Sequence, residues 1–167
     1  MMPDPDDPSW GSPFAIRATF LRPAPGAVAD RPASAAEGEA LLARLEGAPA
    51  ELDAASAGVE EYQALAVFRN AMIWETWLAY ALDQLATGGP LAVGGNMRLR
   101  LNGPPSVESF RESYAGQRSA NAAVARERGP GLWAQAAGGR PPLTAHQVLA
   151  SIAALDAERL ALLREER

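Results

Sequence analysis

The sequence predicts a mainly α-helical domain that packs around one central helix and carries a small antiparallel sheet. Residues 59–86 form a long apolar segment without Gly or Pro, which is typical of a buried helix. Other helical segments begin with capping-box motifs, which mark helix starts. Three short stretches, 14–21, 91–93 and 97–101, have the pattern of strands and predict a two- or three-stranded sheet.

Length and composition limit the classes of protein to be considered. At 167 residues the chain is expected to form one domain, which we place at residues 14–167. The formal net charge of −5 argues against a general nucleic-acid-binding protein. The chain has no cysteine and only one histidine, which excludes disulfides, thiolate metal sites and histidine-cluster metal sites. We therefore expect no metal and no cofactor.

The N-terminal residues 1–13 are rich in Pro and Asp and contain too little apolar surface to fold alone. We expect them to form an extended arm, and their acidic composition differs from that of a signal peptide. The next stretch, 14–21, alternates apolar and polar side chains and predicts a strand that ends before Pro23. The apolar face of this strand would consist of Phe14, Ile16, Ala18 and Phe20.

A first helix is predicted from the capping box of Ser34 and Glu37, in which the glutamate lies three residues after the serine. Gly47 is expected to end this helix as a left-handed cap. Residues 49–57 leave room for a further helical turn before the central helix begins.

The central helix, 59–86, is apolar around most of its circumference, so we expect it to be the most buried element. Trp74 and Leu78 are expected to lie in the core. The charged residues of this helix argue against a membrane span. A narrow polar seam follows a seven-residue spacing: Arg69, Thr76 and Asp83.

Two short strands are predicted after the central helix. Gly and Pro residues mark turns on both sides of 91–93, and apolar residues alternate with arginines in 97–101. An isolated hairpin is marginally stable, so the strand 14–21 is its expected partner.

Two helices complete the chain. The first is predicted from Val107 to Arg128, after an N-cap at Ser106. The last follows a capping box formed by Thr144 and Gln147. Its apolar stripe is expected to face the core and comprises Val148, Leu149, Ile152, Leu155, Leu160 and Leu163.

Glu75 departs from the pattern of the central helix, because it falls within the apolar arc rather than on the polar seam. A buried carboxylate has to be paired or protonated. We expect a structural ion pair with an arginine of the hairpin or of the following helix. The alternative is a general acid or base, for which His146, in the first turn of the last helix, is a second candidate.

A set of arginines could bind a phosphate or carboxylate group. Two of them share the polar face of the strand 97–101, and two share a helix face at seven-residue spacing. The alternative is a pair of exposed faces balanced by neighbouring glutamates. The Gly-rich segment 87–96 lacks the pattern of a phosphate-binding loop. The anion-binding candidates are Arg98, Arg100, Arg111 and Arg118.

The arm and the strand that follows it predict a site for a protein partner. A strand at the start of a chain tends to lie at a sheet edge, where a partner's strand can extend it. The neighbouring arm can place its tryptophan in a groove of that partner. The candidate partner-binding residues are Trp10, Phe14, Ile16 and Phe20.

These observations favour a non-catalytic structural or interaction subunit of a larger assembly, such as a multi-subunit enzyme or a phage-like particle. It would bind a protein partner as a hetero- or homo-oligomer, without nucleic acid or membrane, in the cytoplasm or in a virion-like particle. A small-molecule or peptide-binding module is the alternative. A small enzyme that uses Glu75 and His146 is a third interpretation.

Overall fold

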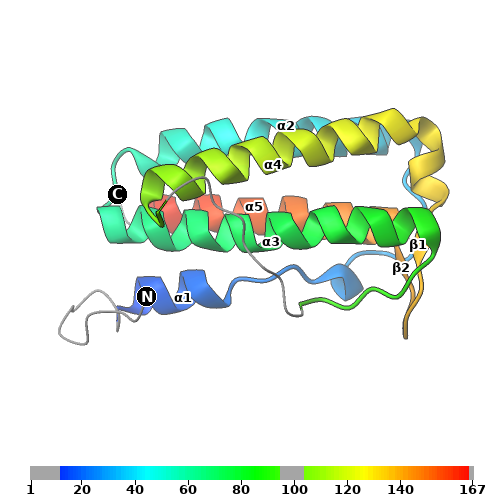
Figure 1. Cartoon of the computed structure of the whole chain (residues 1–167), viewed down its shortest axis with the longest axis horizontal. Helices are drawn as coiled ribbons and strands as arrows, with labels where there is room; N and C mark the ends of the chain where they lie inside the picture. Colours follow the sequence, from blue (N-terminus) through cyan, green and yellow to red (C-terminus); the bar gives the residue numbers. More distant parts are fainter. Residues whose placement is uncertain (1–11, 95–103, 166–167) are drawn as a thin grey trace.

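The computed structural model describes residues 12–94 and 104–165. In this part the chain is mainly helical with a small antiparallel sheet, so the predicted fold class is confirmed (Figure 1). The helices are α1 Pro13–Phe20, α2 Ala35–Ser56, α3 Glu61–Thr87, α4 Val107–Arg128 and α5 Ala145–Glu165. Short 3-10 helices span Pro25–Ala27 and Gly129–Ala134, and the strands are β1 Ala136–Ala137 and β2 Leu143–Thr144.

Helices α2 to α5 form a four-helix bundle, and α1 lies outside it (Figure 1). The colours along the chain show that α3 and α4 run in one direction and that α2 and α5 run in the other. Both α2 and α3 pack against α4 and α5, which places α2 and α3 at diagonal corners of the bundle. Because α3 and α4 are parallel neighbours, the connection 88–106 has to join opposite ends of the bundle. α1 packs mainly against α3.

Residues 14–21 do not form the predicted strand, because all but the last belong to helix α1. Ser12 is the N-cap of this helix, and its hydroxyl accepts a hydrogen bond of 3.1 Å from the backbone N–H of Ala15. Pro13 occupies the first helical position, where its fixed φ suits a helix and its missing N–H is not needed. Residues 1–11 of the predicted arm lie outside the described residues.

The two faces of α1 explain why the alternating pattern was misleading. Phe14 and Ala18 lie one turn apart and are buried, whereas Ile16 and Phe20 lie one turn apart and are exposed. Four apolar residues at alternate positions can therefore lie on one face of a strand, or they can lie in pairs on two opposite faces of a helix. The packing of Phe14 and Ala18 into the apolar cluster beneath them selects the helix, which the N-cap at Ser12 then stabilises.

A single helix, α2, spans the region in which Gly47 was predicted to end the first helix. Pro49 lies inside α2 and has no N–H to donate to the carbonyl of Leu45, four residues earlier. That carbonyl instead accepts a hydrogen bond of 2.8 Å from Nη1 of Arg118, on α4. A side chain of another helix therefore satisfies the group that the proline leaves free.

The predicted helix starts are confirmed. Ser106 accepts a hydrogen bond of 3.0 Å from the backbone N–H of Ser109 at the start of α4. The capping box before α5 is also formed, because Thr144 and Gln147 exchange hydrogen bonds of 3.0 and 3.1 Å. In the capping box of α2, the glutamate also pairs with an arginine of the preceding loop at 2.7 Å.

This capping box makes stability sensitive to acid. Hydrogen bonds from Arg31 and Ser34 lower the pKa of Glu37 from 4.5 to about 2. A carboxyl group with a depressed pKa in the folded state contributes stability above its ordinary pKa and loses it as the pH falls through the folded pKa. We expect the thermal midpoint, measured by circular dichroism, to decrease as the pH is lowered from about 4.5 to about 2. The Glu37→Gln variant should show a shallower fall, and equal slopes would contradict this linkage.

Helix α3 agrees closely with the predicted central helix and ends at Gly88, which has a left-handed conformation with φ of 71°. Its deepest aromatic residue is Trp77, which is 0% exposed, and Leu78 beside it is buried as predicted. Trp74 was predicted to lie in the core, but its side chain is only partly buried and packs against the edge of the apolar cluster. The indole N–H of Trp74 contacts the carbonyl of Leu21 at the end of α1, whereas Trp77 is fully buried in the bundle.

The sheet is not where the sequence pattern placed it. The paired strands are β1 and β2, with Ala136 opposite Thr144. Residues 91–93 form no strand, and the only pairing next to them among the described residues is an isolated parallel bridge between Pro90 and Gly138. The predicted strand 97–101 lies outside the described residues.

The interior of the bundle contains two apolar clusters, one towards each end. The cluster towards the β1–β2 end includes Leu42, Trp77, Leu82, Leu132 and Ile152. The cluster towards the other end includes Leu52, Phe68, Phe110, Tyr114 and Leu163. Buried charged side chains lie between the two clusters.

Candidate functional site

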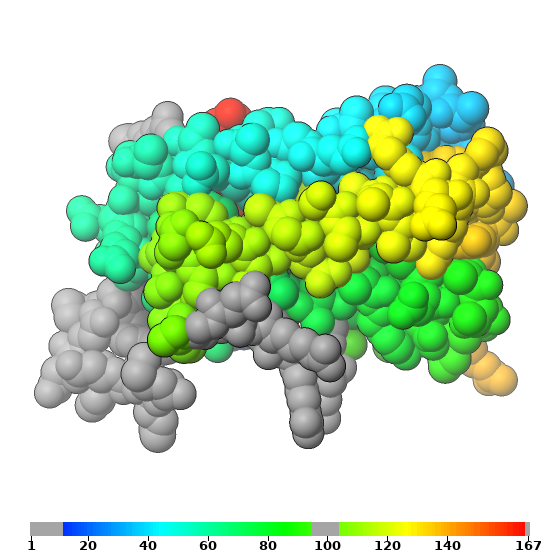
Figure 2. All heavy atoms as spheres, turned by 45° about the horizontal axis from the view of Figure 1, so that its top comes forward, coloured from blue at the N-terminus to red at the C-terminus, as the bar shows by residue number. Residues whose placement is uncertain are grey.

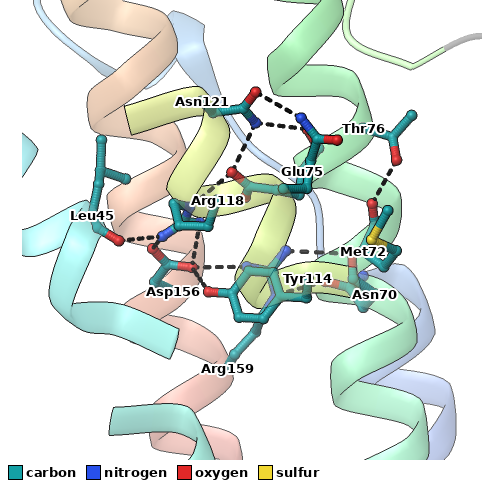
Figure 3. Close-up of polar contacts among 11 residues, drawn as sticks. Leu45, Asn70, Met72, Glu75, Thr76, Tyr114, Arg118, Asn121, Asp156 and Arg159 are labelled. Carbon is teal, nitrogen blue, oxygen red and sulfur yellow. Dashed lines mark hydrogen bonds and ion pairs between the residues drawn. The ribbon is translucent and has the colours of Figure 1, made fainter. Parts of the chain in front are cut away.

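A layer of buried charged side chains crosses the middle of the bundle (Figure 3). We call it the ionic layer, and it consists of Glu75 of α3, Arg118 of α4, and Asp156 and Arg159 of α5. Its two carboxyl groups and two guanidinium groups balance in number. On one side of the molecule α2 and α4 cover the interior in continuous contact (Figure 2).

Arg118 lies at the centre of the ionic layer and donates hydrogen bonds to three other helices. Its Nε lies 2.8 Å from Oε1 of Glu75, and its Nη1 lies 2.8 Å from the carbonyl oxygen of Leu45. Nη1 and Nη2 donate to the two carboxylate oxygens of Asp156, at 2.7 and 3.0 Å. The predicted ion pair between Glu75 and an arginine of the following helix is confirmed. One guanidinium group thus fixes the positions of α2, α3 and α5 relative to α4.

Arg159 connects the ionic layer to the end of α1. Its Nη1 donates to Oδ1 of Asp156, and its Nε donates to the side-chain oxygen of Asn70, both at 2.9 Å. The amide nitrogen of Asn70 donates at 2.8 Å to the carbonyl of Leu21, the C-cap of α1. The indole N–H of Trp74 donates to the same carbonyl at 2.9 Å.

The electrostatics of the layer depend on pairing across helices. Burial by itself would lower the pKa of Arg118, but Glu75 and Asp156 more than offset burial, and the pKa is raised. Burial lowers the pKa of Arg159, because Asp156 offsets the effect only in part. Burial also raises the pKa of Tyr114, whose hydroxyl lies 3.3 Å from Oδ1 of Asp156. Asp156 is therefore the carboxylate that both buried guanidinium groups share.

The ionic layer has little access to solvent. Oε1 of Glu75 accepts hydrogen bonds from Arg118 and Asn121, whereas its Oε2 has no partner among the described residues. A hollow of about 100 Å³ between α2 and α5 reaches Asp156. A volume of this size has room for a few water molecules rather than a substrate. The arrangement is therefore suited to holding helices in register.

His146 lies in the first turn of α5 and is half-buried. Its Nδ1 lies 3.1 Å from the backbone carbonyl oxygen of Arg31, to which the ring N–H donates. Asp156 of the ionic layer is ten residues further along α5, a rise of about 15 Å. The structure therefore does not bring His146 next to Glu75, and the two do not form an acid–base pair.

Of the four arginines proposed as an anion site, the structure describes Arg111 and Arg118. Arg118 is buried in the ionic layer. Arg111 lies nearer the surface and forms ion pairs of 2.8 and 3.1 Å with carboxylates of α2 and α4. Arg98 and Arg100 lie outside the described residues.

Two of the predicted partner-binding residues lie on the surface of α1. Ile16 is 49% exposed and Phe20 is 75% exposed, and we call this pair the docking face. They are four residues apart, so they project from the same side of the helix. Phe14 is buried on the opposite side, and Trp10 lies outside the described residues.

A second surface feature is a groove at the end of the bundle that carries β1 and β2. It has a volume of about 640 Å³. It is lined by residues of the loop before α2, of α3 and the loop after it, and of β2 and the β1–β2 turn, and none of them is Asp or Glu. The lining includes Pro25, Tyr80, Pro90, Val93, Arg140 and Pro141.

Sequence reasoning missed most of the ionic layer, although one signal was available. Asp156 and Arg159 lie on the same face of α5 as the buried leucines, as Glu75 lies on the apolar arc of α3. A polar residue on an apolar helix face indicates a buried partner on another helix. Asn70 carries no such signal, because its role depends on where α1 ends.

Neither a metal-binding cluster nor a membrane-spanning helix occurs among the described residues. Residues 12–94 and 104–165 contain no group of three or more His, Asp or Glu side chains that could hold a metal ion. Within the same ranges, no helix is long and apolar enough to cross a membrane.

Comparisons with known proteins do not assign this chain to a class. No protein-family model, no curated protein and no solved structure matches it. Its function has to be argued from the docking face, the ionic layer and the groove.

Proposed function

We propose that this chain is an interaction subunit of a larger protein assembly and that it binds its partner through the docking face of α1. The observation that carries this proposal is the exposure of Phe20, at 75%, one turn from Ile16, at 49%. Two large apolar side chains at positions i and i+4 form the contact pattern of a helix that binds in an apolar groove. The partner would therefore be a protein that offers such a groove.

The way in which α1 is held supports this proposal. Phe14 and Ala18 attach its inner side to the apolar cluster beneath it. Asn70 and Trp74 attach its C-terminal end through the carbonyl of Leu21. A helix of eight residues would not be stable alone in water, so these contacts hold it in position. A docking face that is already ordered avoids part of the entropic cost of binding.

The ionic layer favours an interaction subunit over an enzyme. Glu75 and Arg118 are each 1% exposed, and their polar atoms mainly contact one another and neighbouring helices. The layer therefore contributes to the shape and rigidity of the bundle. A multi-subunit enzyme or a phage-like particle is the kind of assembly in which we place such a rigid helical subunit.

Site-specific photocrosslinking tests the proposal. Benzoylphenylalanine placed at Phe20, in the full chain expressed in its native cells, should form one predominant adduct with a partner protein. The matched control is the same photoprobe at Val124, which is an exposed apolar residue of α4. That position should not give the same adduct. An Ile16→Ser substitution should reduce the adduct formed from position 20, because it removes half of the docking face.

Two results would contradict the proposal. The first is the absence of a defined protein adduct from position 20. The second is the same set of adducts from positions 20 and 124, which would indicate random collisions rather than a docking face.

A further inference from the structure

The groove beside the β1–β2 turn combines the volume of a ligand site with a mainly apolar lining that contains no Asp or Glu. Its volume of about 640 Å³ lies within the range of ligand pockets. Tyr80 is 47% exposed and stands beside Pro90, whose carbonyl oxygen lies 3.4 Å from the tyrosine hydroxyl. Pro141, which is exposed, supplies further apolar surface, whereas Pro25 borders the groove but is itself buried. Surfaces of aromatic and proline side chains bind extended, proline-rich segments.

The charges around the groove favour an acidic occupant. Arg140 lines the groove, and Nη2 of Arg22 lies 3.4 Å from the carbonyl oxygen of Val93, which also lines it. Both arginines are exposed, and neither forms an ion pair with a carboxylate of the described residues. Other exposed arginines, such as Arg44 and Arg69, also form no ion pair among the described residues, so what distinguishes the groove is that two such arginines lie at a lining without Asp or Glu. In a chain with a net charge of −5, the groove is thus a local site for an anionic segment.

The N-terminal sequence of this chain has the complementary chemistry. Residues 1–10, MMPDPDDPSW, contain three prolines, three aspartates and a tryptophan. Residues that precede proline prefer extended conformations, which reduces the entropy lost on binding. The aspartates suit Arg22 and Arg140, and the prolines and tryptophan suit the apolar walls. We propose that the groove binds the N-terminal residues 1–11 of a second copy of this chain.

The position of α1 indicates why the occupant comes from a second copy. Trp10 precedes the N-cap, Ser12, by two residues, so it can lie only about 7 Å from that residue. α1 itself is about 12 Å long, and Pro25 lies beyond its other end. The groove borders the β1–β2 turn, at the opposite end of the molecule from the start of α1 (Figure 1). The tryptophan of the same copy therefore cannot reach the groove, so an occupant that places Trp10 in it has to come from a second copy.

Sedimentation equilibrium of the full chain tests this inference. We expect concentration-dependent self-association that weakens at high salt, because the contacts are exposed ion pairs. Arg140→Glu should raise the dissociation constant about fivefold or more, and so should a chain in which Asp4, Asp6 and Asp7 are changed to Asn. A synthetic peptide of residues 1–11 should dissociate the wild-type complex. The matched control, Arg44→Glu on α2, should leave self-association unchanged.

The outcomes separate this inference from the proposal for the docking face. Phe20→Ser should leave self-association unchanged, because Phe20 does not line the groove. A wild-type chain that stays monomeric up to about 0.5 mM would overturn the inference. An effect of Arg140→Glu no larger than that of Arg44→Glu would overturn it as well. Loss of self-association in Phe20→Ser would overturn it by assigning the contact to α1, and photocrosslinking from position 20 remains a separate test of the docking face.

Discussion

Asp156→Ala is expected to destabilise the folded protein by about 3–5 kcal/mol, because it leaves two buried guanidinium groups without their shared carboxylate. Arg118 loses both hydrogen bonds to Asp156, and Arg159 loses its only carboxylate partner among the described residues. Small domains are stable by about 5–15 kcal/mol, so this loss is a large fraction of the total. Urea denaturation followed by circular dichroism measures it.

The matched control for this substitution is Glu158→Ala. Glu158 is an exposed carboxylate on the same helix, two residues further on, so its removal should change stability by less than about 0.5 kcal/mol. If Asp156→Ala lies within about 1 kcal/mol of the wild type, the ionic layer does not hold the bundle together.

Trp77→Ala is the second change with a large expected effect, at about 3–5 kcal/mol. The indole is 0% exposed and packs within the cluster near β1 and β2. Its N–H also donates at 2.9 Å to the carbonyl oxygen of Ala92.

Trp74→Ala is the natural comparison, because Trp74 also donates one hydrogen bond to a loop carbonyl. It is only partly buried, so we expect a loss of about 1–2 kcal/mol. The difference between the two variants therefore measures apolar burial, since each loses one similar hydrogen bond. Equal losses, measured by the same urea titration, would contradict the assignment of Trp77 to the interior.

The sequence predicted those features of the fold that depend on local chemistry. The capping boxes at Ser34 and Thr144 and the N-cap at Ser106 were correct, because each motif satisfies N–H groups within its own helix. The prediction of the central helix was correct, because a wide apolar arc is typical of a buried helix. The partner of Glu75 was predicted in kind, since a buried carboxylate needs a cation.

The remaining features depend on contacts between distant segments. Helix α2 continues past Pro49, which leaves the carbonyl oxygen of Leu45 without its usual backbone donor. Arg118, far along the chain, donates the hydrogen bond instead. Residues 14–21 fit a strand or a helix equally well as an alternating pattern, and packing of Phe14 against α3 selects the helix. The groove forms where Tyr80 of α3 and Leu143 of β2 meet three loops, none of which carries a motif of its own.

The ionic layer and the C-terminal end of α1 are joined by one series of hydrogen bonds. Arg159 donates to Asn70, and Asn70 donates to Leu21, which ends α1. We infer that the layer does more than stabilise the bundle: it fixes the helix that carries Ile16 and Phe20. This relation between the interior and the binding surface is the central claim of our account.

Amide hydrogen exchange of Asn70→Asp tests that claim most directly. The new carboxylate can still accept a hydrogen bond from Arg159, but it has no N–H to donate to the carbonyl of Leu21. We predict that the amides of α1 exchange about tenfold faster than in the wild type, while those of α2 to α5 keep their rates. Unchanged exchange in α1, or equally faster exchange in all helices, would contradict the claim.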